Sequence, residues 1–239
     1  MTSTQEIGLV QLEIRKLIAK LQWATPREPH QHFSWGCRPL VAIVFSIFFG
    51  GGLVAGEFNS VQDIGAVAPD WVELPGVDGK SYSLKDFESS AVVVLVFTCN
   101  SCPYAVDYEN RINDLAKKWD SAEKPVSVIA INSNKIEEDA MPAMQTRAAD
   151  KKFVFPYLFD ESQKTAKDYG AVRTPEFFVL NSERRIIYMG KFDDNTREAD
   201  VKRKYVEEAI ASTMEGTTLE ISETPPVGCA IRFQRERRR

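Results

Sequence analysis

The chain has 239 residues, of which 44% are hydrophobic and 27% are charged, and its formal net charge is -4. This balance is typical of one ordinary α/β domain with extensions. A mildly acidic chain has no general attraction for nucleic acid, so we expect no nucleic-acid partner; the arginines at the C-terminus form only a short local cluster.

Residues 1–39 form a leader that precedes the most apolar part of the chain. Five aliphatic residues recur in it at a spacing of three and four, which would place them on one face of a helix: Ile7, Val10, Ile14, Leu17 and Leu21. The pattern is too short to predict a coiled coil. It indicates a short amphipathic helix in a cytoplasmic leader, to which we assign no function.

An uncharged apolar segment at 40–56 follows the leader. As a helix with a rise of 1.5 Å per residue it would reach about 25 Å, which barely spans a bilayer core. Basic residues precede it and acidic residues follow it: Arg15, Lys16, Lys20, Arg27 and Arg38 before, and Glu57, Asp63 and Asp70 after. By the positive-inside rule, we expect a transmembrane signal-anchor that holds the rest of the chain on the extracytoplasmic, periplasmic side.

A cleaved signal peptide is the alternative interpretation of the same segment. The small residues at 54–56 are a possible signal-peptidase site, and cleavage there would release a secreted or periplasmic protein. The leader is long for a signal peptide, and the length and flanks of the segment leave both possibilities open.

After a linker at 57–64, residues 65–214 alternate between extended and helical patterns, and residues 215–239 read as an irregular basic tail. The predicted extended segments are 72–74, 81–84, 91–97, 126–131 and 155–159, with a hairpin formed by 176–180 and 186–189. The predicted helices are 105–119, 137–151, 162–169 and 201–214. The run at 91–97 is nearly all β-branched or aromatic, so we expect a strand that is buried on both faces.

The sequence Cys-Asn-Ser-Cys at 99–102 lies directly between that strand and a predicted helix. Cys99 would therefore stand at a helix N-terminus, where backbone N–H groups and the helix dipole favour a thiolate. The position indicates a nucleophilic thiol.

Metal and haem sites fit this pair of cysteines poorly. Zinc sites commonly have four ligands, yet Cys37 and Cys229 are isolated and His30 and His32 lie near the N-terminus. Haem attachment needs a histidine where Pro103 stands. We therefore expect no metal and no cofactor, and two inert core cysteines remain the alternative.

Several motifs together resemble the thioredoxin superfamily, and most closely its redoxin branch. That branch includes alkyl hydroperoxide reductase and thiol-specific antioxidant proteins and membrane-tethered thioredoxin-like proteins. The motifs are Ala68-Pro69-Asp70, Asp78-Gly79-Lys80, residues 84–87, the strand at 92–97, the CxxC, Thr174-Pro175 and the terminal hairpin and helix. The resemblance implies an α/β, thioredoxin-like fold over 65–214, with a central mixed sheet flanked by helices behind an N-terminal membrane segment.

The resemblance also implies roles for individual residues. It implies catalytic residues Cys99 and Cys102 and substrate contacts at Asn100, Ser101, Thr174 and Pro175. Cys99 would attack a substrate disulfide and Cys102 would resolve the mixed disulfide. Pro175 would be a cis-proline that presents the backbone of Thr174 to an extended substrate.

The sequence departs from the family pattern at three places, one of which is the central dipeptide Asn100-Ser101, which has no proline. Thr98 replaces the usual tryptophan before the first cysteine, and Val93 stands where a buried acid commonly assists proton transfer. Deprotonation of Cys102 would then need water or another side chain.

We therefore expect an extracytoplasmic thiol-disulfide oxidoreductase that acts on protein disulfides or dithiols and exchanges electrons with another thiol protein. A peroxiredoxin-like, antioxidant peroxidase is one alternative. Peroxiredoxins have a threonine three residues before the reactive cysteine, which neither Cys99 nor Cys102 has. Arg173 is the residue that could lower the pKa of the reactive thiol. A non-catalytic binding module is the other alternative. Cys229 could be a further redox thiol, form a structural disulfide or stay free, and the sequence leaves these three possibilities open.

Overall fold

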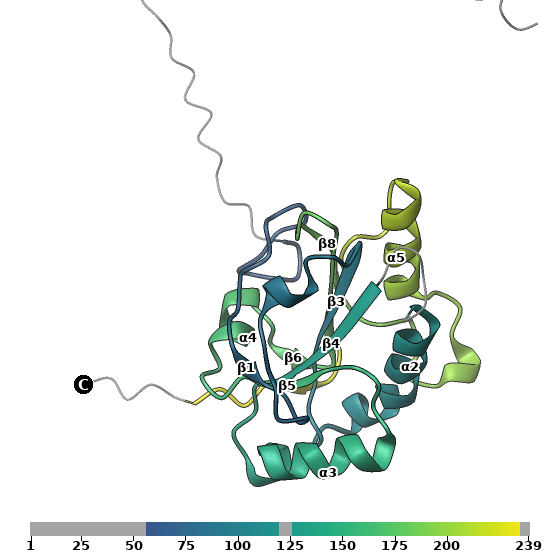
Figure 1. Ribbon diagram of the computed structural model, residues 1–239. Coiled ribbons are helices and arrows are strands. Elements are labelled where there is room, and N and C mark those ends of the chain that lie inside the picture. Colours follow the sequence, from purple (N-terminus) through teal and green to yellow (C-terminus); the bar gives the residue numbers. More distant parts are fainter. Residues whose placement is uncertain (1–55, 120–125, 235–239) are drawn as a thin grey trace, which may run out of the picture. The chain divides into compact units, whose positions relative to one another are not determined.

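A five-stranded mixed sheet organises residues 56–119 and 126–234, the part of the chain that the computed structural model describes (Figure 1). The strand order is β5-β4-β3-β7-β8. The strands are β3 (Val92–Phe97), β4 (Val126–Asn132), β5 (Tyr157–Phe159), β7 (Glu176–Leu180) and β8 (Ile186–Gly190). β3 pairs in parallel with β4 and antiparallel with β7, and every residue of β3 is buried, as the sequence predicted.

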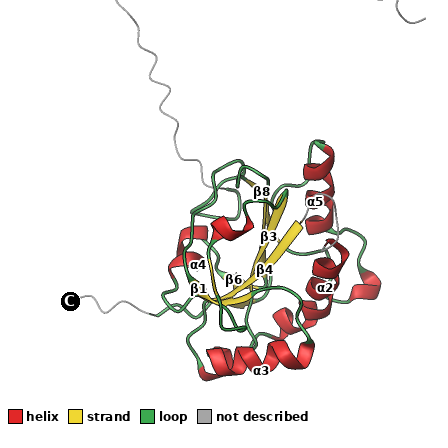
Figure 2. Cartoon of the chain, viewed as in Figure 1, coloured by secondary structure: helices red, strands yellow, loops and turns green. Residues whose placement is uncertain are grey.

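Helices cover both faces of the sheet (Figure 2). They are α2 (Pro103–Trp119), α3 (Met141–Lys151), α4 (Lys164–Tyr169) and α5 (Tyr205–Glu215). Alternate side chains of β3 point to opposite faces, so one set packs with α2, α3 and α5 while the other packs with α4 and the chain that precedes β3. The expected thioredoxin-like arrangement, a central mixed sheet flanked by helices, is confirmed.

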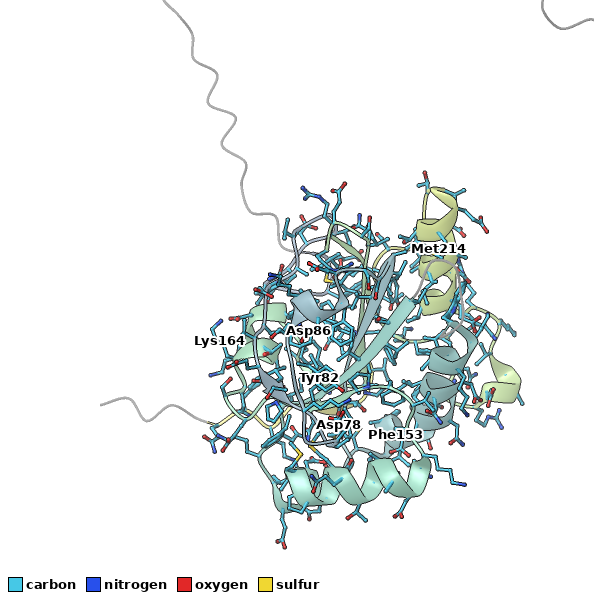
Figure 3. The ribbon with its side chains drawn as sticks, in the orientation of Figure 1. Asp78, Tyr82, Asp86, Phe153, Lys164 and Met214 are labelled. Carbon is cyan, nitrogen blue, oxygen red and sulfur yellow. The ribbon has the colours of Figure 1, made fainter. Side chains whose placement is uncertain are left out.

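Short elements connect these layers. They are β1 (Leu74–Pro75), β2 (Ser81–Tyr82), β6 (Arg173–Thr174), β9 (Cys229–Ala230) and the 3-10 turns η1 (Leu84–Phe87), η2 (Glu137–Asp139) and η3 (Glu198–Asp200). Asp78 closes the β1–β2 turn, since it accepts hydrogen bonds from the Lys80 N–H (3.2 Å) and the Tyr82 hydroxyl (2.7 Å) (Figure 3).

Two predicted helices are shorter than expected. The segment 137–151 is divided into η2 and α3, because Pro142 has no N–H to donate and is tolerated only in the first turn of a helix. The segment 201–214 becomes helical only at Tyr205, because residues 202 and 203 hydrogen-bond to Asp194 instead.

The described parts of the predicted linker and tail pack on the domain. The Glu223 carboxylate accepts hydrogen bonds from the N–H groups of residues 57–59 at 2.7 to 2.9 Å. Farther along, β9 pairs antiparallel with β6. The ordered unit therefore extends beyond 65–214 at both ends.

The predicted membrane segment cannot be placed in this fold. Within 56–119 and 126–234, no helix is long and apolar enough to cross a membrane. The leader at 1–39 and residues 40–55 of the apolar segment lie outside the described residues.

Candidate active site

The two cysteines of the CxxC lie where the central strand passes into a helix. β3 ends at Phe97 and α2 begins at Pro103, so both thiols lie in the loop between them, and Cys102 directly precedes the helix. Cys99 is 3% exposed and Cys102 is 1% exposed, and both are free thiols. The sequence-based placement of this motif between a buried strand and a helix is correct.

Thr174 contacts both thiols. Its hydroxyl oxygen lies 3.4 Å from Cys99 Sγ, and its carbonyl oxygen accepts a hydrogen bond from Cys102 Sγ at 3.0 Å. The peptide bond between Thr174 and Pro175 is cis. Residues far apart in sequence thus form one site, as the resemblance implied.

Asp139 holds the two residues between the cysteines, and sequence reasoning missed it. One of its carboxylate oxygens accepts the N–H groups of Asn100 (2.8 Å) and Ser101 (2.9 Å), and the other accepts the Ser101 hydroxyl (2.7 Å) and the Asn134 side-chain amide (2.9 Å). The carboxylate is fully buried. It satisfies backbone donors of the loop between β3 and α2, which would otherwise be left without a partner.

The side chains of Asn100 and Ser101 already have partners within the protein. The Ser101 hydroxyl donates to Asp139, while the Asn100 side chain donates to the Glu138 carbonyl (3.0 Å) and accepts from the Tyr157 hydroxyl (3.1 Å). These contacts fix the shape of the turn that carries the thiols.

The two thiols titrate as a pair. The interaction between the two neighbouring thiols, together with burial, raises the pKa of Cys99, and the same interaction lowers the pKa of Cys102, because the pair shares one proton. At neutral pH the site therefore carries one thiolate, the form that attacks disulfides.

Cys229 brings a third thiol to the site. It lies opposite Thr174 in the β6–β9 pairing and packs against the buried cluster of Cys99, Cys102 and Ala105. Its thiol is also free, and the neighbouring Cys102 thiol raises its pKa. The sequence left the position of Cys229 open.

Arg173 and Glu176 flank Thr174 and Pro175. The exposed Arg173 guanidinium donates to the Gly228 carbonyl at 2.9 Å, so it holds the C-terminal segment. Glu176 is buried and accepts the N–H groups of residues 172 and 173, and burial raises its pKa to about 7. Glu176 is thus a buried acid one residue after the cis-proline, which the sequence pattern alone did not reveal.

A cavity of about 120 Å³ opens beside the cis-proline. It is lined by Tyr104, Tyr108, Pro175, Val227 and residues 191–196. The backbone edge of β6, implied for an extended substrate, is occupied by β9, so this cavity is the open space next to Pro175.

Comparison with known proteins agrees with this geometry. Residues 64–189 match the AhpC/TSA family. The thiol-disulfide oxidoreductase ResA of Bacillus cereus is 27% identical over 154 residues, which are 63% of this chain and 83% of ResA.

Two solved structures are also similar. A conserved protein from Geobacillus kaustophilus is 31% identical with a TM-score of 0.68, over 74% of this chain and 96% of that one. A hypothetical protein from Sinorhizobium meliloti 1021 is 30% identical with a TM-score of 0.67, over 74% of this chain and 97% of that one. Together with the fold and the dithiol, these matches show that the chain belongs to the AhpC/TSA family, in the redoxin branch of the thioredoxin superfamily.

Proposed function

We propose that this chain is a thiol-disulfide oxidoreductase that exchanges electrons with protein disulfides through Cys99 and Cys102. The observation that carries the proposal is that both thiols contact Thr174. The Thr174 hydroxyl lies next to Cys99, and its carbonyl accepts a hydrogen bond from Cys102. The similarity to ResA, whose name states this activity, supports it.

The reaction begins when Cys99 passes its proton to Cys102 and so becomes the attacking thiolate. It attacks one sulfur of a substrate disulfide, so that a mixed disulfide forms and one substrate thiolate leaves. Cys102 then loses its proton and attacks Cys99 Sγ, which forms the Cys99–Cys102 disulfide and releases the second substrate thiolate. The substrate gains two electrons and the dithiol loses two, and a reducing thiol protein of the second half-reaction restores the dithiol.

The surroundings of the thiols support these two roles. Asp139 fixes Asn100 and Ser101, so Cys99 and Cys102 are held within one turn of each other. The cavity beside Pro175 is where we place the substrate side chains that flank the target cysteine.

We further propose that residues 40–56 anchor the chain in the membrane, with the domain on the periplasmic side. The support is the uncharged segment and the basic-to-acidic change across it. Carbonate extraction of membranes and labelling of intact cells with an impermeant thiol reagent test this: an anchored chain stays in the membrane fraction. Recovery of a shortened chain in the soluble periplasmic fraction would support signal cleavage instead.

The activity is tested with the full-length chain in detergent micelles and a small protein disulfide as substrate. We expect reduction by the wild type, none above background with Cys99→Ala, and accumulation of a mixed disulfide on Cys99 with Cys102→Ala, because the resolving thiol is then missing. Cys37→Ala is the matched control, and we expect it to keep wild-type activity.

Two other results would replace this proposal. Rapid consumption of peroxide with protein disulfides left untouched would identify a peroxidase. Inertness in both assays, with a bound partner retained by the variant lacking both Cys99 and Cys102, would identify a binding module.

A further inference from the structure

The C-terminal segment, residues 224–234, lies along the edge of β6 next to the dithiol. In the β6–β9 pairing, Thr174 is opposite Cys229 and Arg173 is opposite Ala230. The pairing is extended by a hydrogen bond from the Ile231 N–H to the Val172 carbonyl at 2.9 Å. An edge strand that adds to a sheet in this way binds as a peptide ligand would.

Buried contacts hold this segment in a single register. Ile231 is 6% exposed and packs in the core on the α4 face of the sheet. Gln163, itself 2% exposed, donates to the Arg232 carbonyl (3.0 Å) and accepts from the Gln234 N–H (2.8 Å). Cys229 is therefore placed by the fold and is not a loose thiol in a solvated tail.

Gly228 allows the segment to come this close. A Cβ at this position would lie 2.0 Å from the Thr174 carbonyl oxygen, the same oxygen that accepts the hydrogen bond of Cys102. The residue after this glycine is Cys229, which packs against the buried cluster of Cys99, Cys102 and Ala105.

Cys102 is the common neighbour of the other two thiols. It shares a buried cluster with Cys99, and its thiol donates to the carbonyl of Thr174, the residue opposite Cys229 in the β6–β9 pairing. A disulfide between two cysteines requires neighbouring side chains, and the packing of Cys229 against this cluster brings the three side chains together.

We propose that Cys229 is a third redox thiol, which accepts the disulfide of the Cys99–Cys102 pair and forms a Cys102–Cys229 disulfide. The inference rests on the proposed exchange activity, because that activity supplies the Cys99–Cys102 disulfide.

The exchange needs no further oxidant. Cys229 loses its proton and its thiolate attacks Cys102 Sγ; the Cys102–Cys229 bond forms, the Cys99–Cys102 bond breaks, and Cys99 leaves as a thiolate or takes up the released proton. One disulfide is exchanged for another, so the oxidation state of the protein does not change. Cys99 becomes a free thiol, and the disulfide now joins Cys102 and Cys229. A reducing thiol protein can then reduce this disulfide.

The test uses the full-length chain in detergent, equilibrated with mixtures of reduced and oxidised glutathione, then acid-quenched, alkylated and mapped by mass spectrometry. In Cys99→Ala we expect an intramolecular Cys102–Cys229 disulfide that outcompetes the mixed disulfide of Cys102 with glutathione. The matched control, Cys99→Ala with Cys229→Ala, should show only the glutathione adduct. Cys99→Ser provides a second background if the alanine variant does not fold.

The wild type provides the second readout. After one round of substrate reduction, its peptides should contain both the Cys99–Cys102 and the Cys102–Cys229 linkages. A Cys229 that is fully alkylated in every oxidised sample would overturn the proposal, and so would a Cys99–Cys229 linkage in place of Cys102–Cys229.

Failure of the proposed function gives a different pattern. If the wild type does not reduce protein disulfides but Cys99→Ala still closes Cys102–Cys229, the exchange activity is refuted while the thiol pairing stands. If the wild type is active and Cys229 never enters a disulfide, only the present inference is refuted.

Discussion

A single buried carboxylate shapes the turn between the two thiols of the CxxC. Asp139 accepts four hydrogen bonds, of which three come from Asn100 and Ser101. Its negative charge also opposes ionisation of Cys99, raising the pKa of that thiol. The residue therefore links the geometry of the dithiol to its acidity.

We expect Asp139→Asn to destabilise the protein by about 1–3 kcal/mol, because the new NH₂ group would meet the Asn134 amide, so that at least one buried donor loses its acceptor. Loss of the negative charge should also lower the thiol pKa. Chemical denaturation measures the first effect and the pH dependence of thiolate ultraviolet absorbance measures the second. Asp107→Asn, on the exposed side of α2, is the matched control and should change neither.

Glu176 makes the stability of the protein depend on pH. Burial raises its pKa from 4.5 to about 7 in the folded protein, so below pH 4.5 the group is protonated in both states. As the pH rises from there to about 7, the unfolded chain gives up this proton first. Stability is then lost, by about 3 kcal/mol in total, and the loss is complete above the folded-state pKa.

Glu176→Gln removes this titration while keeping an oxygen for the N–H groups of residues 172 and 173. We expect the free energy of unfolding of the variant, relative to the wild type, to rise with pH between about 4.5 and 7. Denaturant titrations across that range measure it. The exposed Glu138→Gln is the control, and a difference independent of pH for Glu176→Gln would contradict the assignment.

At the scale of elements, the close approach of β9 to β6 depends on one glycine. Gly228 has φ +144°, and its missing Cβ leaves room for the Thr174 carbonyl. We expect Gly228→Ala to release β9, because an added methyl would overlap backbone atoms that cannot move without disturbing the cis-proline loop. The rate of Cys229 alkylation in the reduced protein should then rise.

Gly216→Ala is the matched control for that prediction. Gly216 also has a positive φ, +69°, but no atom lies within 4 Å of its would-be Cβ. The Gly216→Ala variant therefore shows the effect of placing an alanine at a positive φ without any steric contact. Equal alkylation rates for Cys229 in both variants would show that contact with Thr174 does not hold β9 in place.

At the scale of the molecule, Glu223 joins the first described residues to the chain that follows α5. Its carboxylate accepts three N–H groups from residues 57–59. We expect Glu223→Ala to cost about 2 kcal/mol and to speed hydrogen exchange of those amides. Glu220→Ala, which removes only an exposed ion pair with Arg203, should cost less than about 1 kcal/mol.

The sequence was sufficient to predict the central layers of the fold. The strand at 92–97, the helix after the CxxC and the hairpin at 176–190 carry local hydrophobic patterns, and all three are present. Asp139 and Glu176 could not be recognised in this way, since their roles depend on donors that only the folded chain brings to them. The same holds for Cys229, whose segment has little pattern of its own and gains its structure from β6.

The pairing of β6 with β9 has a consequence for self-association. An open strand edge presents unpaired N–H and C=O groups to which a strand of another chain can add. In this protein the chain's own C-terminus covers that edge beside the reactive thiols. A second copy therefore cannot pair with the backbone groups of β6 that β9 already occupies.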